Sequence, residues 1–332
     1  MRSYATASMS PRRSLALAVG IPGAAYSGHA AWQFQRDLRA ARARVSAGAR
    51  VAHTASGPIE YAEVGDGPAV LVVHGAGGGV DQGLDFGGVL AFAGFRVIAM
   101  SRFGYLGTPL PFDASPQAQA DAHAHLLDAL GVGRAAIAGA SAGAPSSMQF
   151  ALRHRERCTA LALLVPAAYV PRPAGRPPVL APAATQILFD TALRSDFLFW
   201  AATKTMRRAL IRGLLATPPS LVDHASAEER ARVDAIVDHI LPVSARRLGL
   251  RNDARVVTTL PRYDLESIDV PTLIASAEDD LYGTFDVAHY LMRHMPRARF
   301  IGYPHGGHVW VGHHRGLMAE VVAFLRRATE GA

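Results

Sequence analysis

Three groups of residues in this 332-residue chain could carry out chemistry together: a serine between glycines, a run of carboxylates and a group of histidines. The serine is Ser141 in the sequence Gly-Ala-Ser-Ala-Gly, the carboxylates stand at residues 278–280, and the histidines lie within residues 305–314. A serine hydroxyl at its normal pKa is a weak nucleophile, so it needs a histidine base and a carboxylate that orients the histidine. The three groups therefore predict covalent catalysis by an activated serine.

The surroundings of Ser141 give the five-residue motif its meaning. The apolar run Ala135–Ala138 is typical of a buried strand and leads directly into the motif, and a helix is expected over Ala142–Arg153. A serine on a tight strand-to-helix turn needs small neighbours two residues away, here Gly139 and Gly143. The first N–H groups of the helix are free to stabilise a developing anion. We therefore predict Ser141 as a nucleophile; a glycine-rich turn without function is the alternative.

A second loop could supply the donors that stabilise an oxyanion. It follows the apolar run Ala69–Val73 and reads His-Gly-Ala-Gly-Gly-Gly from His74 onward. Backbone N–H groups in such a loop can point at a negatively charged oxygen, and we expect those of Ala76, shared with Gly77, and of Ala142 to do so. A phosphate site is the alternative, but the loop lacks the glycine spacing of a dinucleotide-binding motif and the Lys-Ser/Thr ending of a P-loop. His74 is expected to shape the loop rather than to act as a base.

Carboxylates and histidines follow the last two expected strands. Thr272–Ser276 ends just before the carboxylates and Arg299–Tyr303 just before the histidines, so both groups should lie at the sheet edge that carries Ser141. From the residues alone, the acid stays open within residues 278–280. His308 is the favoured base, and three other histidines are alternatives: His305, His313 and His314. A metal site would need carboxylate or cysteine partners at ligand spacing, so we predict neither a metal nor a cofactor.

The order of the expected elements predicts an α/β fold. Short continuous apolar runs, typical of strands buried on both faces, alternate with helical segments. Strands are expected at residues 51–54, 59–64, 69–73, 97–100, 135–138, 160–165, 272–276 and 299–303, with Gly57-Pro58 as the turn between the first two. Such alternation gives a mostly parallel central sheet with helices on both faces. The core would comprise residues 49–167 and 264–332.

The segment between the two parts of the core is expected to form a helical lid. Residues 168–263 contain no apolar run typical of a buried strand; they open with a proline-rich stretch and continue with helical segments. Four aromatic side chains of this segment could line an apolar substrate pocket: Phe189, Phe197, Phe199 and Trp200. The alternative is that they only pack the lid onto the sheet.

The N-terminal residues 1–48 contain a stretch without charged side chains. No Asp, Glu, Lys or Arg occurs at residues 14–32, arginines flank the stretch on both sides, and glycines and a proline interrupt it. Its length is near the roughly 20 residues that cross a bilayer, which predicts a membrane anchor and a membrane-associated protein. The alternatives are an export signal and an N-terminal extension of a cytoplasmic protein. Residues 33–45 are expected to form a linker helix.

The overall charge does not indicate a nucleic-acid partner. The formal net charge is +7, but the chain has a single lysine, Lys204, and its arginines are mostly scattered rather than gathered in a stripe. Half of the residues are apolar and 18% are charged, which allows a sizeable core. The only cysteine, Cys158, excludes an internal disulfide. We expect a small-molecule substrate as the partner, and the oligomeric state stays open.

Taken together, these motifs resemble the α/β-hydrolase superfamily, in its serine-nucleophile branch, over about residues 50 to 328. The segments that match are His74-Gly75, residues 101–108, residues 139–143, Val270-Pro271-Thr272-Leu273, Glu278-Asp279-Asp280 and Gly306-Gly307-His308. In this family the acid lies three residues after a small residue at a strand end, which implies Asp280, with Asp279 as the second choice. The resemblance also assigns the base to His308, the histidine after paired glycines.

Three positions refine this resemblance. Ser101 stands where many relatives have Asp, and Ala277 replaces the usual Gly before the acid. A serine at position 141 distinguishes the chain from haloalkane dehalogenases and epoxide hydrolases, which it would resemble only with a carboxylate nucleophile.

The sequence as a whole predicts a serine hydrolase. It would cleave an ester-like, apolar small molecule through a Ser141–His308–Asp280 triad and an acyl-enzyme. One alternative is a lyase, or a cofactor-free enzyme similar to perhydrolases and haloperoxidases, on the same triad. Two others are a non-catalytic binding protein on a hydrolase scaffold and a membrane-tethered partner protein. The fold does not decide between substrates.

Overall fold

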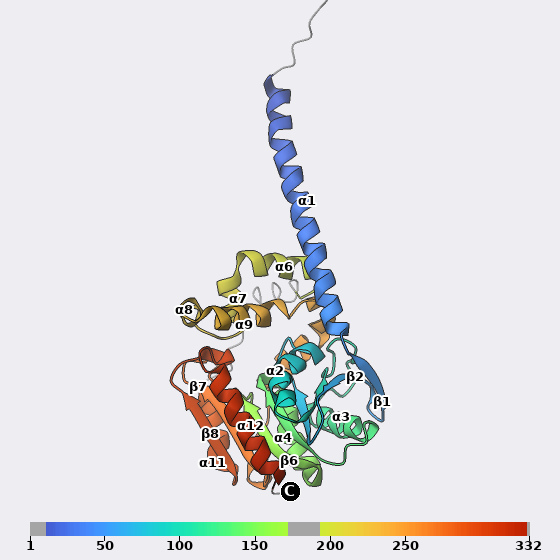
Figure 1. Ribbon diagram of the computed structural model, residues 1–332, viewed down its shortest axis with the longest axis vertical. Coiled ribbons are helices and arrows are strands. Elements are labelled where there is room, and N and C mark those ends of the chain that lie inside the picture. Colours follow the sequence, from blue (N-terminus) through green and yellow to red (C-terminus); the bar gives the residue numbers. More distant parts are fainter. Residues whose placement is uncertain (1–10, 172–192, 331–332) are drawn as a thin grey trace, which may run out of the picture.

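A central sheet carries the segments expected to do chemistry. In the computed structural model, which describes residues 11–171 and 193–330, eight strands form one sheet in the order β1-β2-β4-β3-β5-β6-β7-β8 (Figure 1). The strands are β1 Arg50–Thr54, β2 Gly57–Val64, β3 Ala69–Val73, β4 Arg96–Met100, β5 Ala135–Ala140, β6 Cys158–Leu164, β7 Thr272–Ala277 and β8 Ala298–Tyr303. The pairs β1–β2 and β2–β4 are antiparallel, and all other neighbours are parallel. The prediction of a mostly parallel sheet in an α/β fold is confirmed.

The register brings the carboxyl ends of the parallel strands to one edge. Val73 at the end of β3 pairs with Gly139 of β5, and Ala277 at the end of β7 pairs with Tyr303 at the end of β8. The chain therefore leaves the sheet at this edge just before the glycine-rich loop, Ser141, the carboxylates and the histidines. Loops at the carboxyl edge of a parallel sheet are where such folds place their sites.

The first hairpin differs from its prediction. Gly57-Pro58 is not the turn; the turn is Ala55-Ser56, and Gly57-Pro58 begins β2, paired with Thr54 and His53 of β1. The strand β2 pairs with β4 only from Tyr61 onward. Because Pro58 lies before that point, its missing N–H costs no hydrogen bond to β4.

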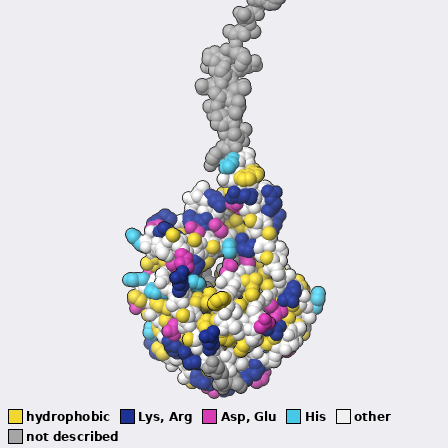
Figure 2. Space-filling model, in the orientation of Figure 1, with side chains coloured by type: hydrophobic (Ala, Val, Ile, Leu, Met, Phe, Trp, Pro, Cys, Tyr) yellow, Lys and Arg dark blue, Asp and Glu magenta, His cyan; other side chains and the backbone are white. Residues whose placement is uncertain are grey.

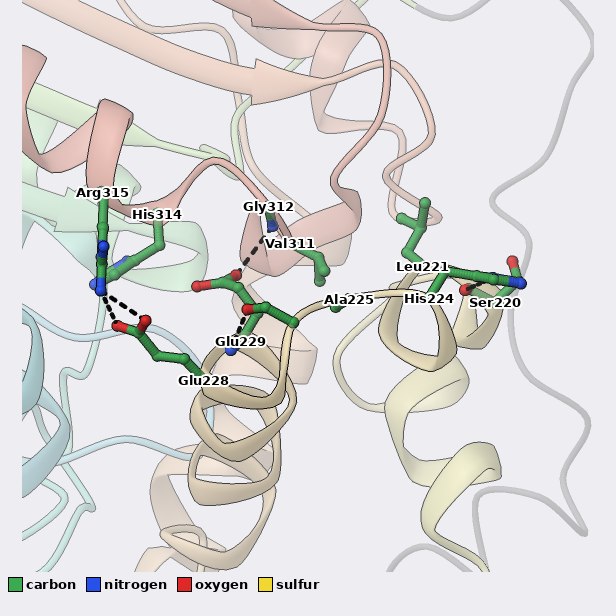
Figure 3. Close-up of a pocket in the computed structure, with 11 residues that line it drawn as sticks. Ser220, Leu221, His224, Ala225, Glu228, Glu229, Val311, Gly312, His314 and Arg315 are labelled. Atoms are coloured by element: carbon green, nitrogen blue, oxygen red, sulfur yellow. Dashed lines mark hydrogen bonds and ion pairs between the residues drawn. The ribbon is translucent and has the colours of Figure 1, made fainter.

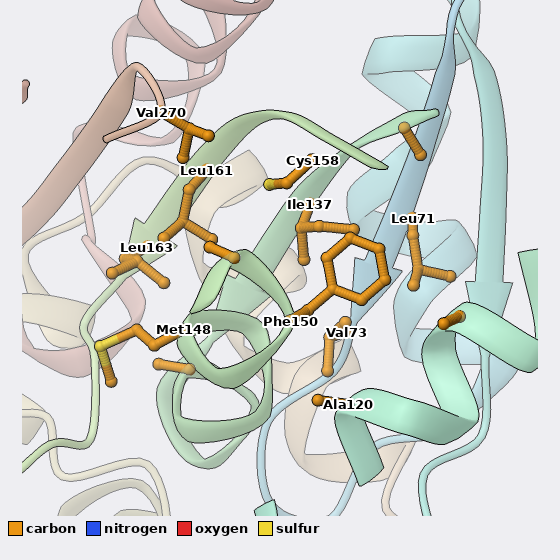
Figure 4. Close-up of a cluster of buried hydrophobic side chains, with 14 of the residues drawn as sticks. Leu71, Val73, Ala120, Ile137, Met148, Phe150, Cys158, Leu161, Leu163 and Val270 are labelled. Carbon is orange, nitrogen blue, oxygen red and sulfur yellow. The ribbon is translucent and has the colours of Figure 1, made fainter. Parts of the chain in front are cut away.

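Apolar side chains of the strands alternate between two buried clusters. Along β3, Leu71 and Val73 belong to one cluster, and Val70 and Val72 to the other. This is the two-residue period of a strand with a packed layer on each face. Figure 4 shows the first cluster, in which the ring of Phe150 lies against the side chains of the sheet.

Helices cover both faces of the sheet. On the face of Leu71 these are α3 Pro116–Ala129, α4 Ala144–Arg153 and α11 Thr284–His294. On the face of Val72 they are α2 Val80–Phe92 and α12 His314–Glu330. The prediction of helices on both faces is confirmed.

The segment from residue 193 to residue 263 forms a helical layer over the carboxyl edge of the sheet (Figure 1). Its helices are α6 Asp196–Thr205, α7 Arg207–Gly213, α8 Pro219–Asp223, α9 Ala227–Asp238 and α10 Arg247–Thr258, with a 3-10 turn, η3, at Val243–Arg246. Ser195 and Ser226 cap two of these helices by accepting hydrogen bonds from the N–H groups of Leu198 and Glu229. No strand occurs in the described part of residues 168–263, and we call this helical layer the lid.

A long N-terminal helix, α1 Pro11–Ser46, precedes the sheet and extends away from the rest of the protein (Figure 1). The expected linker helix at residues 33–45 is the carboxyl-terminal part of α1, where Leu38 and Ala41 are buried. Residues 14–32 are helical as well, but over residues 11–171 and 193–330 no helix is long and apolar enough to cross a membrane. The sequence signal for a span is thus not supported by the structure, since glycines and a proline dilute the stretch.

Surface charges of both signs are mixed over the face shown in Figure 2, in keeping with the scattered arginines of the sequence. Lys and Arg side chains gather where α1 joins the domain (Figure 2), and the exposed arginines of this part of α1 are Arg36, Arg39 and Arg42.

Candidate active site

The turn between β5 and α4 holds Ser141 in a strained conformation. Ser141 has a φ of +49°, a value that residues other than glycine rarely adopt. It begins a short 3-10 turn, η1 Ser141–Gly143. The glycines two residues away leave no room for a side chain. A Cβ on Gly139 would lie 2.2 Å from Ser147 Oγ, and one on Gly143 would lie 2.5 Å from the carbonyl oxygen of Val73. The requirement for small residues on both sides of Ser141 is therefore steric.

His308 connects Ser141 to a carboxylate. Its Nε2 lies 2.9 Å from Ser141 Oγ, and its Nδ1 lies 2.8 Å from Asp280 Oδ2. The histidine lies in the 3-10 turn η5 Gly307–Val309 after β8, and the backbone reaches it through Gly307, whose φ is +61°. In a neutral imidazole, an Nδ1–H that donates to Asp280 leaves Nε2 free to accept the hydroxyl proton of Ser141.

The structure brings Asp280, and not Asp279, to His308. Asp280 is 4% exposed and accepts hydrogen bonds from the Tyr282 N–H at 2.9 Å and from the Thr284 hydroxyl, in addition to its contact with His308. The Asp279 carboxylate instead accepts the N–H of Gly307 at 2.7 Å. The two neighbouring carboxylates therefore differ in position: one contacts the imidazole and the other fixes the loop that carries it.

The alternative histidines lie elsewhere. His305 is exposed and its Nδ1 lies 3.6 Å from Asp279. His313 stacks on Tyr303 with 4.2 Å between ring centroids, and His314 accepts a hydrogen bond from Trp310 Nε1 at 3.1 Å. In the described part of the chain, no group of three or more His, Cys, Asp or Glu side chains is arranged to hold a metal ion.

The glycine-rich loop lies against Ser141. A Cβ on Gly75 would be 3.3 Å from Ser141 Cβ, so the loop and the nucleophile turn are in direct contact. The N–H of Gly77 donates to the Tyr105 hydroxyl at 3.3 Å and is thus already engaged. Ala76 is exposed, and Ala142 lies within the first turn after β5. Of the three expected donors, Gly77 therefore has its N–H engaged by a protein acceptor; donation by Ala76 and Ala142 stays a prediction.

His74 lies beneath this loop as a neutral side chain. Complete burial, followed by the charge of Arg102, lowers its pKa well below the usual value. Its Nε2 accepts the N–H of Arg102 at 3.0 Å, and its Nδ1 therefore donates to the carbonyl oxygen of Gly75 at 2.7 Å. This agrees with the expectation that His74 shapes the loop.

A buried ion pair fixes the end of the loop. Arg246 of η3 donates to the carbonyl oxygen of Gly78 and to Asp81 in the first turn of α2. Arg44 of α1 also donates to Asp81, at 3.2 Å. Next to this pair, the Ser101 hydroxyl donates to Glu60 at 2.6 Å and accepts the N–H of Val80 at 3.2 Å. Ser101 thus helps to hold the start of α2.

The lid aromatics pack mainly against α1. Trp200 donates from Nε1 to Asp37 at 3.0 Å and lies 5.6 Å from Phe34 between ring centroids; Phe197 lies 5.3 Å from Phe34. The expectation that Phe197 and Trp200 line a substrate pocket is not supported, because both lie in the joint between lid and α1. Phe199 is buried in a cluster that also contains Tyr105 and Ile240, and Phe189 lies outside the described residues.

Sequence analysis did not single out several side chains around the site. Tyr282 lies edge-on to His308 with 5.0 Å between ring centroids, and burial, followed by Asp280, raises the Tyr282 pKa. Ile240 of the lid packs 3.4 Å from the place of a Cβ on Gly77. The contact between Thr284 and Asp280 could have been predicted from the sequence, because Thr284 begins a helix only four residues after Asp280. The contact of Ile240 could not, because only the fold brings it to the loop.

A cavity of about 620 Å³ lies between the lid helices α8 and α9 and the segment that follows His308 (Figure 3). It is lined by Ser220, Leu221, His224, Ala225, Ser226, Glu228, Glu229, Val311, Gly312, His314 and Arg315. Two contacts cross it: Glu228 pairs with Arg315, and Glu229 accepts the N–H of Gly312 at 3.0 Å. Neither Ser141 nor His308 lines this cavity, which makes it a neighbour of the candidate site rather than the site itself.

Known proteins share this fold. The chain matches the family described as alpha/beta hydrolase fold over residues 68–311. It is 26% identical over 288 residues to a protein of Burkholderia vietnamiensis named 2-hydroxy-6-oxononadienedioate/2-hydroxy-6-oxononatrienedioate hydrolase, covering 81% of this chain and 91% of that one. An alpha/beta hydrolase fold protein from Nakamurella multipartita is similar in structure, with a TM-score of 0.66, 26% identity and coverage of 84% and 99%. A meta-cleavage product hydrolase from Pseudomonas fluorescens, with a TM-score of 0.63, 20% identity and coverage of 84% and 98%, shares the fold.

The family match spans most of the sheet, the described lid and the turn at Ser141. Three findings agree with this match: the strand order, the strained serine between glycines, and the Burkholderia relative, which is named a hydrolase and is covered over 91% of its length. The chain belongs to the α/β-hydrolase family, and it is a hydrolase.

Proposed function

We propose that the protein is a serine hydrolase in which Ser141 is the nucleophile, His308 the general base and Asp280 the acid that orients His308. The observation that carries this proposal is the chain of two hydrogen bonds, 2.9 Å from Ser141 to His308 and 2.8 Å from His308 to Asp280. It lies at the carboxyl edge of the sheet, where the strained turn points the serine away from its strand.

The reaction would proceed in two steps. His308 takes the proton of Ser141 while the serine oxygen attacks a substrate carbonyl, and Asp280 stabilises the imidazolium that forms. The N–H groups of Ala76 and Ala142 donate to the oxyanion of the tetrahedral intermediate. His308 then protonates the leaving group, and an acyl-enzyme on Ser141 remains. In the second step His308 activates a water molecule that releases the acid.

Labelling of the full chain with a fluorophosphonate probe tests this proposal. Wild type should be labelled, and Ser141→Ala should lose the label along with about 10⁶ in kcat for a p-nitrophenyl ester. Ser220→Ala, at a serine of the lid outside the site, should label as wild type does. A folded wild-type protein that takes up no label would contradict the proposal.

The two neighbouring carboxylates give a matched pair for the role of the acid. Asp280→Asn should lower kcat by about 10⁴, because the imidazole loses the carboxylate that fixes its tautomer. Among the described residues, Asp279 contacts the backbone N–H of Gly307 and the His305 side chain, so kcat of Asp279→Asn should fall far less. Equal losses in both variants would show that Asp280 does not hold the role proposed for it.

A second candidate reaction is hydrolysis of a carbon–carbon bond next to a ketone. The Burkholderia relative is named for a 6-oxo dicarboxylate, which has no ester to cleave. An enzyme for such substrates needs a cationic side chain that binds the substrate carboxylate. Arg247 of α10 is a candidate, since its buried Nε lacks a hydrogen-bond partner among the described residues. Assaying unlabelled wild-type enzyme with a p-nitrophenyl ester and with a 2-hydroxy-6-oxo-dienoate separates the two reactions; turnover of the ester alone would reject carbon–carbon hydrolysis.

Association with a membrane through residues 14–32 stays a prediction of the sequence. It would be checked by flotation of the full chain with phospholipid vesicles, and a chain that remains at the bottom of the gradient would contradict it.

A further inference from the structure

We propose that Asp253, on lid helix α10, is a positioning residue for the oxyanion hole: it holds Arg102 and Tyr105, which fix the backbone of the loop from His74 to Gly77. The inference rests on the proposed serine hydrolase, because it assigns a purpose to a contact between the lid and the loop that faces Ser141. Asp253 does not itself touch the reacting atoms.

Asp253 is buried and holds two side chains of the segment that follows β4. Arg102 donates to both carboxylate oxygens, from Nη1 at 2.8 Å and from Nη2 at 2.6 Å, and the Tyr105 hydroxyl donates to Oδ2 at 2.6 Å. Asp253, Arg102 and Tyr105 are 5%, 6% and 0% exposed. A buried bidentate ion pair of this kind fixes both the orientation of the guanidinium plane and its position.

The far side of Arg102 holds the carbonyl groups of the loop. Its Nε donates to the carbonyl oxygen of His74 at 2.8 Å, and its Nη2 reaches that of Gly75 at 3.3 Å. His74 Nδ1 also donates to the Gly75 oxygen, at 2.7 Å, and the N–H of Gly78 donates to it at 3.3 Å. Three donors therefore meet on one carbonyl oxygen.

That carbonyl belongs to the same peptide unit as the proposed oxyanion donor. In a planar trans peptide, the C=O of Gly75 and the N–H of Ala76 point in opposite directions. Fixing the Gly75 oxygen on the buried side thus turns the Ala76 N–H to the opposite side of the loop, where Ala76 is exposed. Tyr105 fixes the next peptide unit, because its hydroxyl accepts the N–H of Gly77 at 3.3 Å.

The lid is packed closely enough to hold this arrangement. The N–H of Gly249 donates to the carbonyl oxygen of Gly104 at 2.8 Å, and a Cβ on Gly249 would lie 2.1 Å from the Tyr105 ring. Gly249 and Asp253 are four residues apart on α10 and so share one face of the helix. One face of the lid therefore contacts Tyr105 and holds its hydroxyl, which couples the position of α10 to the geometry of the oxyanion hole.

Two variants and one control test the proposal. Tyr105→Phe removes the hydroxyl that joins Asp253 to Gly77 and keeps the ring; Asp253→Asn weakens the hold on both partners. Glu63→Gln is the control. Like Asp253, Glu63 accepts hydrogen bonds from arginine, here Arg50 and Arg96, but it lies near the end of β2 and has no contact named in this proposal. Thermal unfolding midpoints establish that each variant is folded.

The measurements are kcat and KM for a p-nitrophenyl ester and the inhibition constant of a phenylboronic acid, whose tetrahedral adduct occupies the oxyanion hole. We expect kcat to fall about tenfold in Tyr105→Phe and about 100-fold in Asp253→Asn, which is no more than the loss of about 10²–10³ known for one oxyanion donor. The boronic acid should weaken by similar factors while KM stays near that of wild type, because the loss falls on the transition state. Glu63→Gln should change neither constant.

A folded Tyr105→Phe that keeps kcat and boronic acid affinity within twofold of wild type would overturn the inference. This holds even if Asp253→Asn does not fold, because Tyr105→Phe tests the same connection. Labelling of Ser141 in wild type by the fluorophosphonate is measured in the same series. If wild type is labelled and Tyr105→Phe is unaffected, the positioning role alone is rejected; if wild type is not labelled, the serine mechanism itself is rejected.

Discussion

At the scale of single residues, His123 is a buried histidine outside the candidate site. It lies in α3 with no exposed surface, its Nδ1 is 2.9 Å from the sulfur of Met100, and its Nε2 is 3.1 Å from the Ser146 hydroxyl. Burial, followed by the charge of Arg102, lowers the pKa of His123 to about 3. The folded protein therefore keeps this side chain neutral at pH values where an unfolded chain would protonate it.

This histidine predicts a pH dependence of stability. Between the unfolded pKa of about 6.5 and the folded pKa of about 3, unfolding takes up a proton at His123, so stability should fall as the pH falls, by up to about 1.4 kcal/mol per pH unit from this group. His123→Gln should show a shallower loss in urea unfolding between pH 6.5 and pH 4. His53→Gln, at an exposed position on β1, should keep the slope of wild type. An unchanged slope in His123→Gln would rule the explanation out.

The sequence allowed some residues of the site to be predicted and not others, for a physical reason. Ser141 and the loop from His74 stand in local patterns whose geometry follows from neighbouring residues. The choice between Asp280 and Asp279 needed the family pattern, since either carboxylate follows the same strand. Asp253 could not be predicted at all: it lies 151 residues from Arg102 in the chain, and only the folding of the lid brings the two together.

At the scale of the helix, the two glycines Gly249 and Gly316 should respond to alanine in opposite ways. Glycine in a helix costs about 0.5–1 kcal/mol relative to alanine. Around Gly316 of α12 a Cβ would meet nothing within 4 Å, whereas on Gly249 of α10 it would lie 2.1 Å from the Tyr105 ring. Gly316→Ala should therefore raise the free energy of unfolding by up to this amount, and Gly249→Ala should lower it and reduce kcat as well.

Urea unfolding and ester turnover of both variants check this. If Gly249→Ala were as stable and as active as Gly316→Ala, α10 would not pack on Tyr105 as described. The inner strands, such as β3 and β5, were predicted closely because each is a continuous apolar run. The partners of the lid aromatics were not, because a cluster of aromatic residues in sequence does not indicate which surface they cover.

At the scale of the whole molecule, α1 connects parts that are distant in the sequence. Asp37 contacts Trp200 of the lid, and Arg44 contacts both Asp81 in α2 and the carbonyl oxygen of Leu241. Burial favours a neutral Asp37, but hydrogen bonds from Trp200, Arg36 and Lys204 outweigh it and lower the Asp37 pKa to about 2. The last turns of α1 are thus part of the folded body, although the family match begins only at residue 68.

Two truncated chains test this role of α1. Removing residues 1–47 would take away the buried Leu38 and uncover Trp200, at about 1.5–3 kcal/mol for each large apolar side chain whose burial is lost. It would also take Arg44 from Asp81, so both the unfolding midpoint and kcat should fall. Removing residues 1–27 leaves every contact named here in place and should change neither. Identical behaviour of the two truncated chains would show that α1 contributes nothing to the folded body.

The positions of α1 and of the end of α12 decide how the enzyme can be attached to a support. The chain enters beside the lid helix α6, whereas α12 ends at Glu330 on the far side of the sheet (Figure 1). An affinity tag or resin linked to the carboxyl terminus would leave the lid facing the solution. The same linkage at the outer end of α1 would place the support on the side of the body that carries the lid, separated from it by the projecting part of α1. Immobilised enzyme of the first kind should therefore keep more of its turnover of bulky esters than enzyme of the second kind.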